Sequence, residues 1–295
     1  MKIAIITDVH NGKSSINYPH LRDPKYFVVG AVEQFVDYAT ESGADLLLEL
    51  GDRIDNAEHD TDLAVAKELA PVFARFPRKR VHIMGNHDVF HLSKKENEEI
   101  FDCSFDSHII DLGELRLIAW QPRVNFDYEL GCFSPTREHL AWLVRALLED
   151  ERPAIVASHV SPAGRAQTGN FYHHFHPTYS TFPDHEAIRA AVEKTGRLAI
   201  WMSGHSHWNT WTNIGGIHYF TIQSLPEQFT TYPKTAETHA DLIIEKGQFT
   251  LQVHGNDPLY MRLPFQKSSE RFWMPPIVRV GSGAAANVTF PAKQG

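Results

Sequence analysis

The sequence has little cysteine and no long apolar run. Cys103 and Cys132 are the only cysteines among 295 residues, so no disulfide framework is expected and both should be free thiols. No apolar run approaches the roughly 20 residues that span a bilayer. The N-terminal apolar run meets Asp8 too early for a signal peptide. We therefore expect a cytoplasmic protein that does not associate with membranes.

The chain also lacks an excess of basic residues. Acidic residues outnumber basic ones 36 to 28, which gives a net charge of -8. Binding to nucleic acid needs a basic surface, so this balance argues against DNA and RNA as partners. Because 42% of the residues are hydrophobic, the chain can bury a sizeable core, and disorder is excluded as its main state.

Histidine is abundant, with 18 residues against 9 tyrosines and 6 tryptophans. Histidine is the commonest metal ligand and the usual acid or base near neutral pH. The number of histidines does not by itself indicate a metal or catalytic site, because histidines exposed to solvent are easily accommodated. Their positions along the chain are more informative.

Five short apolar runs each end at residues that can bind a metal or transfer a proton. The runs indicate buried strands at residues 2–7, 44–50, 80–84, 154–157 and 198–202. The polar residues that follow them are Asp8 and His10, Asp52 and Asp55, Asn86 and His87, His159, and finally His205 and His207. In open α/β sheets, sites form beyond the carboxyl ends of the strands, so we expect these residues to gather at one edge.

Helical patterns alternate with these strands. They cover residues 26–40, 61–76, 136–148 and 184–195, with Ser134 and Pro135 as the expected start of the third helix and Gly196 as the end of the fourth. The alternation predicts an α/β fold with at least partly parallel pairing. Residues 214–224 and 240–253, the latter turning at Lys246-Gly247, predict a second, more antiparallel sheet.

The residue types within this series suit a metal site. Asp8 and His10 are two residues apart, so in extended conformation both would face the same way and offer an oxygen and a nitrogen ligand. The Asp52 carboxylate has two oxygens and can bridge two cations, whereas Asp55 is expected mainly to cap a turn. Asn86 offers a neutral carbonyl oxygen, and His87 is freer to donate a proton. Each residue alone is more typical of a turn or of an ordinary hydrogen-bonded side chain than of a metal ligand. The ordered series as a whole is not explained in that way.

The ordered series D-x-H, G-D-x-x-D, G-N-H-D, a separate H and G-H-x-H resembles the calcineurin-like metallophosphoesterases. The five blocks span residues 8 to 207, about two thirds of the chain. Within that superfamily, G-D-x-x-D with G-N-H-D resembles the bacterial branch that hydrolyses cyclic nucleotides and glycerophosphodiesters. Purple acid phosphatases usually have Tyr at the position of Asp55 and a G-N-H-E block. No motif beyond His207 matches, so the resemblance does not identify the substrate.

The resemblance implies a fold and a division of roles. The implied fold is αββα: two mixed β-sheets packed as a sandwich and flanked by helices. Asp8, His10 and His207 would hold one metal ion, Asn86, His159 and His205 a second, and Asp52 would bridge both. His87 would stand over the leaving group while a metal-bridging hydroxide attacks phosphorus in line. Such ligands suit Fe, Mn or Zn without choosing among them.

We therefore expect a dinuclear-metal phosphodiesterase that acts on a small diester of the cyclic-nucleotide or glycerophosphodiester type. A phosphomonoesterase is the main alternative, and a nuclease and a non-catalytic binding scaffold are weaker ones. The catalytic domain is expected to cover residues 1–262. Residues 263–295 are expected to form an extension, with an apolar group at residues 272–274, that docks on its own domain or on a second subunit.

Residues 160–183 follow His159 directly and are rich in aromatic residues and histidine. We interpret them either as a substrate lid or as a packed surface loop. The candidate substrate contacts in this stretch are Tyr172, His173, His174 and His176. Arg22 and Arg53 could contact a phosphate, although an ordinary salt bridge is the simpler interpretation of each.

Overall fold

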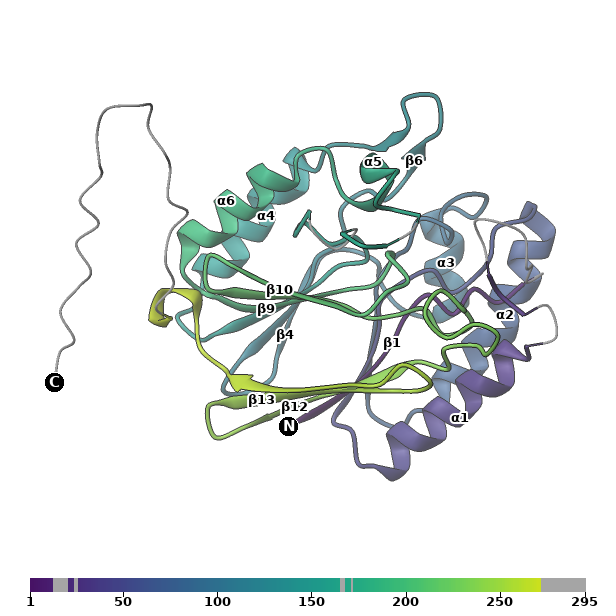
Figure 1. Cartoon of the computed structure of the whole chain (residues 1–295), viewed down its shortest axis with the longest axis horizontal. Helices are drawn as coiled ribbons and strands as arrows, with labels where there is room; N and C mark the ends of the chain where they lie inside the picture. The colour runs from purple at the N-terminus through teal and green to yellow at the C-terminus, as the bar shows by residue number, and fades with distance from the viewer. Residues whose placement is uncertain (13–20, 24–25, 165–167, 171, 272–295) are drawn as a thin grey trace, which may run out of the picture.

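Two six-stranded sheets lie face to face at the centre of the molecule (Figure 1). The computed structural model describes residues 1–12, 21–23, 26–164, 168–170 and 172–271. The first sheet has the order β14-β13-β12-β1-β2-β3. Its parallel strands are β1 (Lys2–Ile6), β2 (Leu46–Glu49) and β3 (Lys79–His82), and its antiparallel strands are β12 (His239–Glu245), β13 (Gln248–His254) and β14 (Leu259–Pro264).

The second sheet has the order β10-β11-β9-β8-β5-β4. Its four central strands pair in parallel and are β5 (Arg116–Ala119), β8 (Ala154–Ala157), β9 (Leu198–Ser203) and β11 (Ile217–Thr221). The antiparallel edge strands are β4 (His108–Asp111) and β10 (Thr210–Ile214). The central strands are covered on both faces, which explains why their sequences are almost continuously apolar.

Helices cover the outer face of each sheet (Figure 1). On the first sheet these are α1 (Val28–Glu41) and α2 (His59–Ala74), with α3 (Lys94–Phe101) beside α2; on the second they are α4 (Arg137–Leu148) and α6 (His185–Thr195). The chain also forms a short helix and a small hairpin near the site, α5 (Pro177–Ser180), β6 (Phe126–Asp127) and β7 (Cys132–Phe133), and a 3₁₀ turn at Ser268–Glu270. No helix in the part of the chain that the structure describes is long and apolar enough to cross a bilayer.

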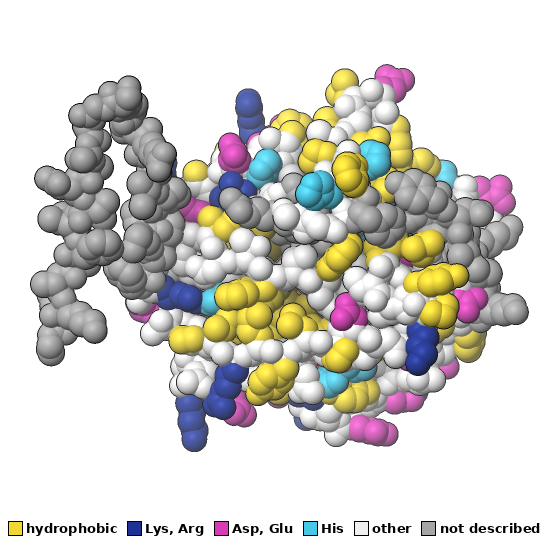
Figure 2. All heavy atoms as spheres, in the orientation of Figure 1, with side chains coloured by type: hydrophobic (Ala, Val, Ile, Leu, Met, Phe, Trp, Pro, Cys, Tyr) yellow, Lys and Arg dark blue, Asp and Glu magenta, His cyan; other side chains and the backbone are white. Residues whose placement is uncertain are grey.

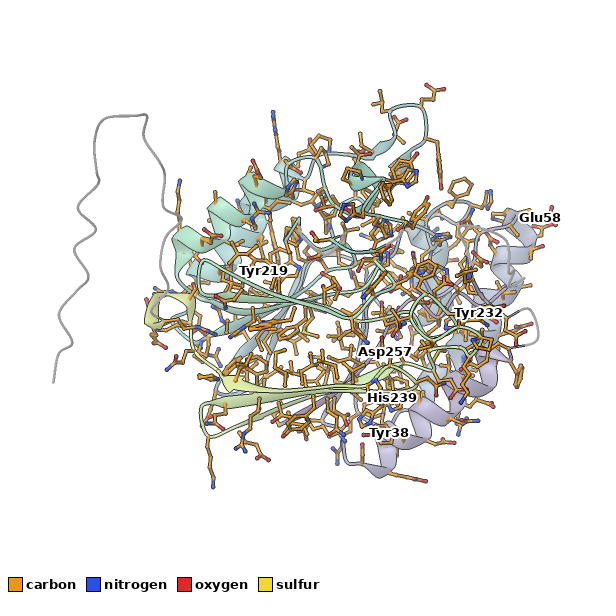
Figure 3. The ribbon with its side chains drawn as sticks, viewed as in Figure 1. Tyr38, Glu58, Tyr219, Tyr232, His239 and Asp257 are labelled. Carbon is orange, nitrogen blue, oxygen red and sulfur yellow. The ribbon has the colours of Figure 1, made fainter. Side chains whose placement is uncertain are left out.

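Alternating side chains divide the core into layers. In β1, Ile3 and Ile5 point toward the second sheet, whereas Ala4 and Ile6 pack against α1 and α2. Figure 3 shows side chains filling the space between the two sheets. The expected αββα sandwich is confirmed, and Cys103 and Cys132 are free thiols as expected.

Three details of the sequence prediction were wrong. The late antiparallel strands do not form a sheet of their own, because β12 pairs with β1 and β11 pairs with β9. The chain within 214–224 turns at Gly215-Gly216 as the β10–β11 hairpin instead of running as one strand. The third helix begins after Thr136 and not at Ser134, because the Thr136 carbonyl accepts from the N–H groups of His139 and Leu140, each at 2.9 Å.

The expected boundary at residue 262 falls inside β14, so the start of the proposed extension is a strand of the first sheet. The apolar group at residues 272–274 lies outside the described residues. Gly196 ends α6 with φ of 65°, as its position after the helical pattern predicted.

Candidate metal centre

The residues that follow five strands meet at one end of the sandwich. Asp8, His10, Asp52 and Asn86 come from the carboxyl ends of β1, β2 and β3 in the first sheet, and His159, His205 and His207 from those of β8 and β9 in the second. The group therefore lies between the two sheets and takes side chains from both.

The first cluster consists of Asp8, His10, Asp52 and His207, whose ligand atoms lie within 4.8 Å of one another. The Nε2 atoms of His10 and His207 are only 2.9 Å apart, and Nε2 of His207 is 3.2 Å from an Asp8 oxygen. All four residues are buried. Two ring nitrogens and two carboxylates that converge in this way fit a metal cation with mixed nitrogen and oxygen ligands.

The second cluster consists of Asp52, His159 and His205. Nε2 of His159 is 3.2 Å from an Asp52 oxygen and 3.2 Å from Oδ1 of Asn86. Asn86 therefore adds a neutral oxygen ligand to this cluster. Asp52 is the one residue that belongs to both clusters, as a bridging carboxylate must.

Backbone in the left-handed region places five of these ligands. The φ angles of Asp8, His10, Asp52, His205 and His207 lie between 44° and 65°. The expectation that Asp8 and His10 are extended was therefore wrong. Such angles cost a non-glycine residue about 1–2 kcal/mol, and they cluster at functional sites where the surrounding structure imposes them.

Two motif glycines allow the strand ends to approach one another. A Cβ on Gly85 would lie 2.1 Å from the backbone nitrogen of Asp52, and a Cβ on Gly204 would lie 2.2 Å from an Asp8 oxygen. Any side chain at either position would push a ligand carboxylate away. The glycines in these blocks are thus required by the packing around the ligands.

Hydrogen bonds behind the ligands determine which ring nitrogen faces the centre. Nδ1 of His159 donates to the Leu50 carbonyl at 2.8 Å, and Nε2 of His205 donates to the Tyr179 carbonyl at 2.7 Å. Nδ1 of His207 donates to Glu227 at 3.1 Å. His159 and His207 therefore present Nε2, and His205 presents Nδ1, with its lone pair available for a metal.

The carboxylates create a field that favours positive charge. Burial would raise the pKa of Asp52, but the charges of His159 and His87 outweigh burial and hold that pKa well below its usual range. Burial likewise opposes protonation of His159 and His207, yet Asp52 raises the pKa of His159 to about 10, and Asp8 and Glu227 raise the pKa of His207 to about 9. Burial lowers the pKa of His205 to about 4. Protons and metal cations would thus compete for the same positions.

His87 lies beside the two clusters. Its backbone N–H donates to Asp52 at 2.8 Å, its Nε2 is 3.9 Å from the other Asp52 oxygen, and its Nδ1 is 3.7 Å from Asp55. Its ring meets the His10 ring edge-on at 4.8 Å. Asp55 therefore contacts the site, beyond the turn-capping role expected for it, and Asp55, His10 and His87 form a third group of converging ligand atoms.

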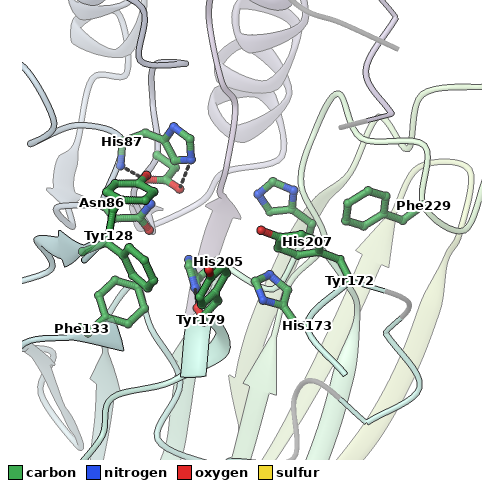
Figure 4. Close-up of a pocket in the computed structure, with 12 residues that line it drawn as sticks. Asn86, His87, Tyr128, Phe133, Tyr172, His173, Tyr179, His205, His207 and Phe229 are labelled. Carbon is green, nitrogen blue, oxygen red and sulfur yellow. Dashed lines mark hydrogen bonds and ion pairs between the residues drawn. The ribbon is translucent and has the colours of Figure 1, made fainter. Parts of the chain in front are cut away.

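A cavity of about 220 Å³ opens above the clusters. Figure 4 shows Tyr128 and Phe133 on the same side as Asn86 and His87, and Tyr172, His173 and Phe229 on the side of His207. The complete lining is Asp52, Asn86, His87, Phe126, Tyr128, Phe133, Tyr172, His173, Tyr179, His205, His207 and Phe229. No Lys or Arg of the described residues lines this cavity.

The sequence comparison identifies the family. The model of the calcineurin-like phosphoesterases matches residues 1–209, which include every ligand of both clusters. The chain belongs to this family. No curated protein matches the chain in sequence.

Solved structures of other phosphoesterases share the fold. A dimetal phosphatase from Danio rerio superposes with a TM-score of 0.73 at 13% identity, over 90% of this chain and 99% of that one. A purple acid phosphatase from yellow lupin seeds superposes with a TM-score of 0.58 at 13% identity, over 88% of this chain and 53% of that one. At this identity the likeness shows the fold alone.

Two of the candidate substrate contacts of this phosphoesterase lie in the protein interior. Arg53 is fully buried, where it pairs with Glu49 at 2.7 Å and Asp88 at 2.9 Å and packs on the rings of Phe101 and Phe105. Arg22 is buried behind Asp55 and pairs with it at 3.3 Å. Neither lines the cavity, so the salt-bridge interpretation replaces that of phosphate contacts.

The segment 160–183 supplies part of the cavity wall. Tyr172 and His173 line the cavity, whereas His174 and His176 do not. Nδ1 of His176 donates to the Tyr172 carbonyl at 2.9 Å and its ring lies against Tyr172, so it supports the wall from behind. His174 accepts a hydrogen bond from the Gly169 N–H at 3.0 Å.

The sequence analysis missed several residues of the site. Glu227 and Phe229 lie beyond the last motif, and Tyr128 and Phe133 come from the small β6–β7 hairpin. The main-chain carbonyl of Tyr179 cannot be recognised as a partner of His205 from sequence. The only local signal for the hairpin was its aromatic content near Gly131.

Proposed function

We propose that this phosphoesterase is a dinuclear-metal hydrolase of small phosphodiesters. The observation that carries the proposal is Asp52, shared by two ligand clusters at the floor of a cavity that no Lys or Arg of the described residues lines. Asp8, His10 and His207 would hold one ion, Asn86, His159 and His205 the other, and Asp52 both. Fe, Mn or Zn would suit these ligands. Two such ions, when bound, lower the pKa of a water and polarise the phosphoryl oxygens.

The protein residues position the ester and supply a proton. His87 lines the cavity next to Asn86 and Asp52, within reach of a leaving oxygen bound at the floor. Burial lowers the pKa of the His87 ring, whereas the carboxylates of Asp52 and Asp55, 3.9 and 3.7 Å from its nitrogens, oppose this and favour the ring that carries protons on both nitrogens. Nε2 would then donate its proton to the leaving oxygen, a contribution typically of about 10²–10⁴-fold.

The charge of the cavity favours a diester over a monoester. A phosphodiester carries one negative charge, whereas a monoester carries about −1.5 to −2 at pH 7. The cavity walls offer aromatic rings and no Lys or Arg of the described residues for the additional charge. Tyr128 and Phe229, on opposite sides in Figure 4, can contact a second ester group that a monoester lacks. Tyr172 and His173 place segment 160–183 in this wall, so we propose that it limits substrate size.

The surface offers little support for a nuclease. Figure 2 shows the Lys and Arg side chains of one face scattered, not gathered into a stripe. The net charge of -8 would repel a polyanion. A non-catalytic scaffold is disfavoured because every residue of the expected ligand set is present in the sequence and the carboxylates and histidines of the set converge in two clusters.

A hydrolysis screen of the metal-reconstituted protein tests the proposal. It compares bis-nitrophenyl phosphate with nitrophenyl phosphate, and then cyclic nucleotides with glycerophosphodiesters. We expect kcat/KM for the nitrophenyl diester to exceed that for the monoester by at least about 10-fold, since contacts to the second ester group are worth at least about 1.4 kcal/mol. A preference for the monoester would establish a phosphomonoesterase instead. No hydrolysis of either ester by metal-loaded protein would overturn the proposal.

Tyr128→Ala provides a second measurement on the same substrates. Tyr128 is exposed and contributes its ring to one wall of the cavity. The variant should raise KM for bis-nitrophenyl phosphate several-fold and change KM for methyl nitrophenyl phosphate much less. Leu130→Ala is the matched control, since Leu130 is exposed on the same hairpin but does not line the cavity.

A further inference from the structure

Glu227 is a fully buried carboxylate outside the part of the chain that the family model matches. It lies in the loop between β11 and β12 and contacts the metal centre from behind. One of its oxygens accepts a hydrogen bond from Nδ1 of His207 at 3.1 Å. The other accepts one from the backbone N–H of Leu21 at 2.8 Å.

We infer that Glu227 is a positioning residue of the metal centre, which fixes the His207 ring and ties one half of the centre to the segment after β1. With Nδ1 held by Glu227, the Nε2 atom of His207 points at Nε2 of His10, 2.9 Å away, and at Asp8, 3.2 Å away. A histidine whose second nitrogen donates to a carboxylate is also a more basic metal ligand.

The two halves of the centre differ in this respect. The ligand histidines of the other cluster, His159 and His205, donate to the main-chain carbonyls of Leu50 and Tyr179. Those partners are neutral and cannot be removed by a side-chain substitution. Of His159, His205 and His207, it is His207 that donates to a side-chain carboxylate. Loss of Glu227 should therefore weaken one metal ion selectively.

The second oxygen of Glu227 extends its effect to another segment. Besides the Leu21 hydrogen bond, Arg22 and Glu227 form an isolated antiparallel bridge of the backbone. The Arg22 side chain in turn pairs with Asp55, which lies 3.7 Å from His87. Glu227 thus connects the late loop, residues 21–23 and the cavity floor in one buried arrangement.

Glu227→Gln is the informative substitution because it preserves the shape and removes the charge. An amide has one oxygen, so it cannot accept from both the His207 ring and the Leu21 N–H; its NH₂ group would face one of those donors. Glu227→Asp retains the charge on a shorter side chain that cannot reach both partners. It serves as the second variant if Glu227→Gln does not fold.

The experiment measures metal affinity of the full chain. The protein is stripped with a chelator and titrated with Zn²⁺ against a chromophoric competitor, and Co²⁺ spectra report the coordination. We expect the affinity for one ion to fall about 10–100-fold in Glu227→Gln while the affinity for the other is unchanged. Excess Zn²⁺ should restore the second ion and the Co²⁺ spectrum.

Asp241→Asn is the matched control. Asp241 is a buried carboxylate of β12 that contacts Nε2 of His254 at 3.1 Å, on the side of the sheet where Tyr38 and His239 lie (Figure 3). This variant should lower the melting temperature of the metal-free protein and leave both Zn²⁺ affinities unchanged.

The outcomes separate this inference from the proposed function. Wild-type affinities for both ions in a folded Glu227→Gln or Glu227→Asp variant would overturn the positioning role. Equal weakening of both ions, matched by the control, would also overturn it, because it would indicate a general loss of stability. A wild-type protein that binds only one ion would refute the dinuclear proposal; a loss of affinity for that ion in Glu227→Gln would still support the role of Glu227.

Discussion

Replacing Arg53 by alanine should destabilise the protein severely, although the sequence alone presents Arg53 as a candidate phosphate contact. The Arg53 side chain is fully buried between two carboxylates and two aromatic rings. Its Nη1 donates to Glu49 at 2.7 Å and to the Ile83 carbonyl at 2.9 Å, and its Nη2 lies 2.9 Å from Asp88. Removal of the guanidinium would leave Glu49 and Asp88 buried without their cation.

The magnitude follows from this burial. Breaking a buried ion pair by removing one partner costs about 3–5 kcal/mol, since the remaining charge is uncompensated. A domain of this size melts about 2–4 °C lower per kcal/mol of lost stability, so the melting temperature should fall by roughly 6–20 °C. The Arg53 side chain sits against Phe101 and Phe105, so truncation also leaves a void beside both rings.

The assay is thermal unfolding of metal-free protein, which separates stability from metal binding at the neighbouring Asp52. Arg75→Ala is the control, since Arg75 is 46% exposed and pairs with Asp37 on the surface. Exposed ion pairs contribute about 0–1 kcal/mol, so this variant should melt within about 4 °C of the wild type. A folded Arg53→Ala protein with the wild-type melting temperature and a raised KM would refute the structural role and restore the phosphate contact.

Three further predictions concern the metal centre and the core. Asp52→Asn should weaken both ions and Asn86→Ala only one; elemental analysis after reconstitution measures this, and full loading of Asp52→Asn would contradict a shared ligand. His87→Ala should keep its metal yet lose far more rate with alkyl diesters than with nitrophenyl diesters, whose leaving group needs little protonation; equal losses would argue against a proton donor. Burial lowers the pKa of His218 to about 3, so the unfolded chain binds its proton first, and stability should fall as the pH drops from about 6.5 toward 3. In chemical denaturation at several pH values, His218→Gln should make the free energy of unfolding depend less on pH between about 6.5 and 3. An unchanged pH dependence would mean that other groups cause the loss of stability.

Local patterns account for the part of the site that the sequence predicted. Asp8, Asp52 and Asn86 were recognisable because each follows a short apolar strand, and the carboxyl ends of parallel strands in one sheet necessarily meet. The helices were also recognisable from a local pattern, because α1 and α6 carry their apolar residues at helical spacing.

The rest depends on contacts between distant residues, which leave no local signal. Nothing in the hairpin of β12 and β13 shows that it extends the first sheet by pairing with β1. A charged residue such as Arg53 is expected at the surface from sequence alone. It is buried here because Glu49 and Asp88 pair with it in the interior. Glu227 lies 20 residues from His207 in a loop without a motif. The left-handed backbone of Asp8 and His10 likewise arises from hydrogen bonds to Gly51 and Asp52 across the strand ends.

The position of the two ligand clusters between the sheets has a consequence for the resistance of the protein to unfolding and proteolysis. Each cluster takes side chains from both sheets, so separating the sheets at this end would take both clusters apart at once. An ion present at 100 times its dissociation constant would then add about 2.7 kcal/mol against unfolding. On the proposed function, the resistance of the folded chain to proteases should therefore rise and fall with the concentration of free metal.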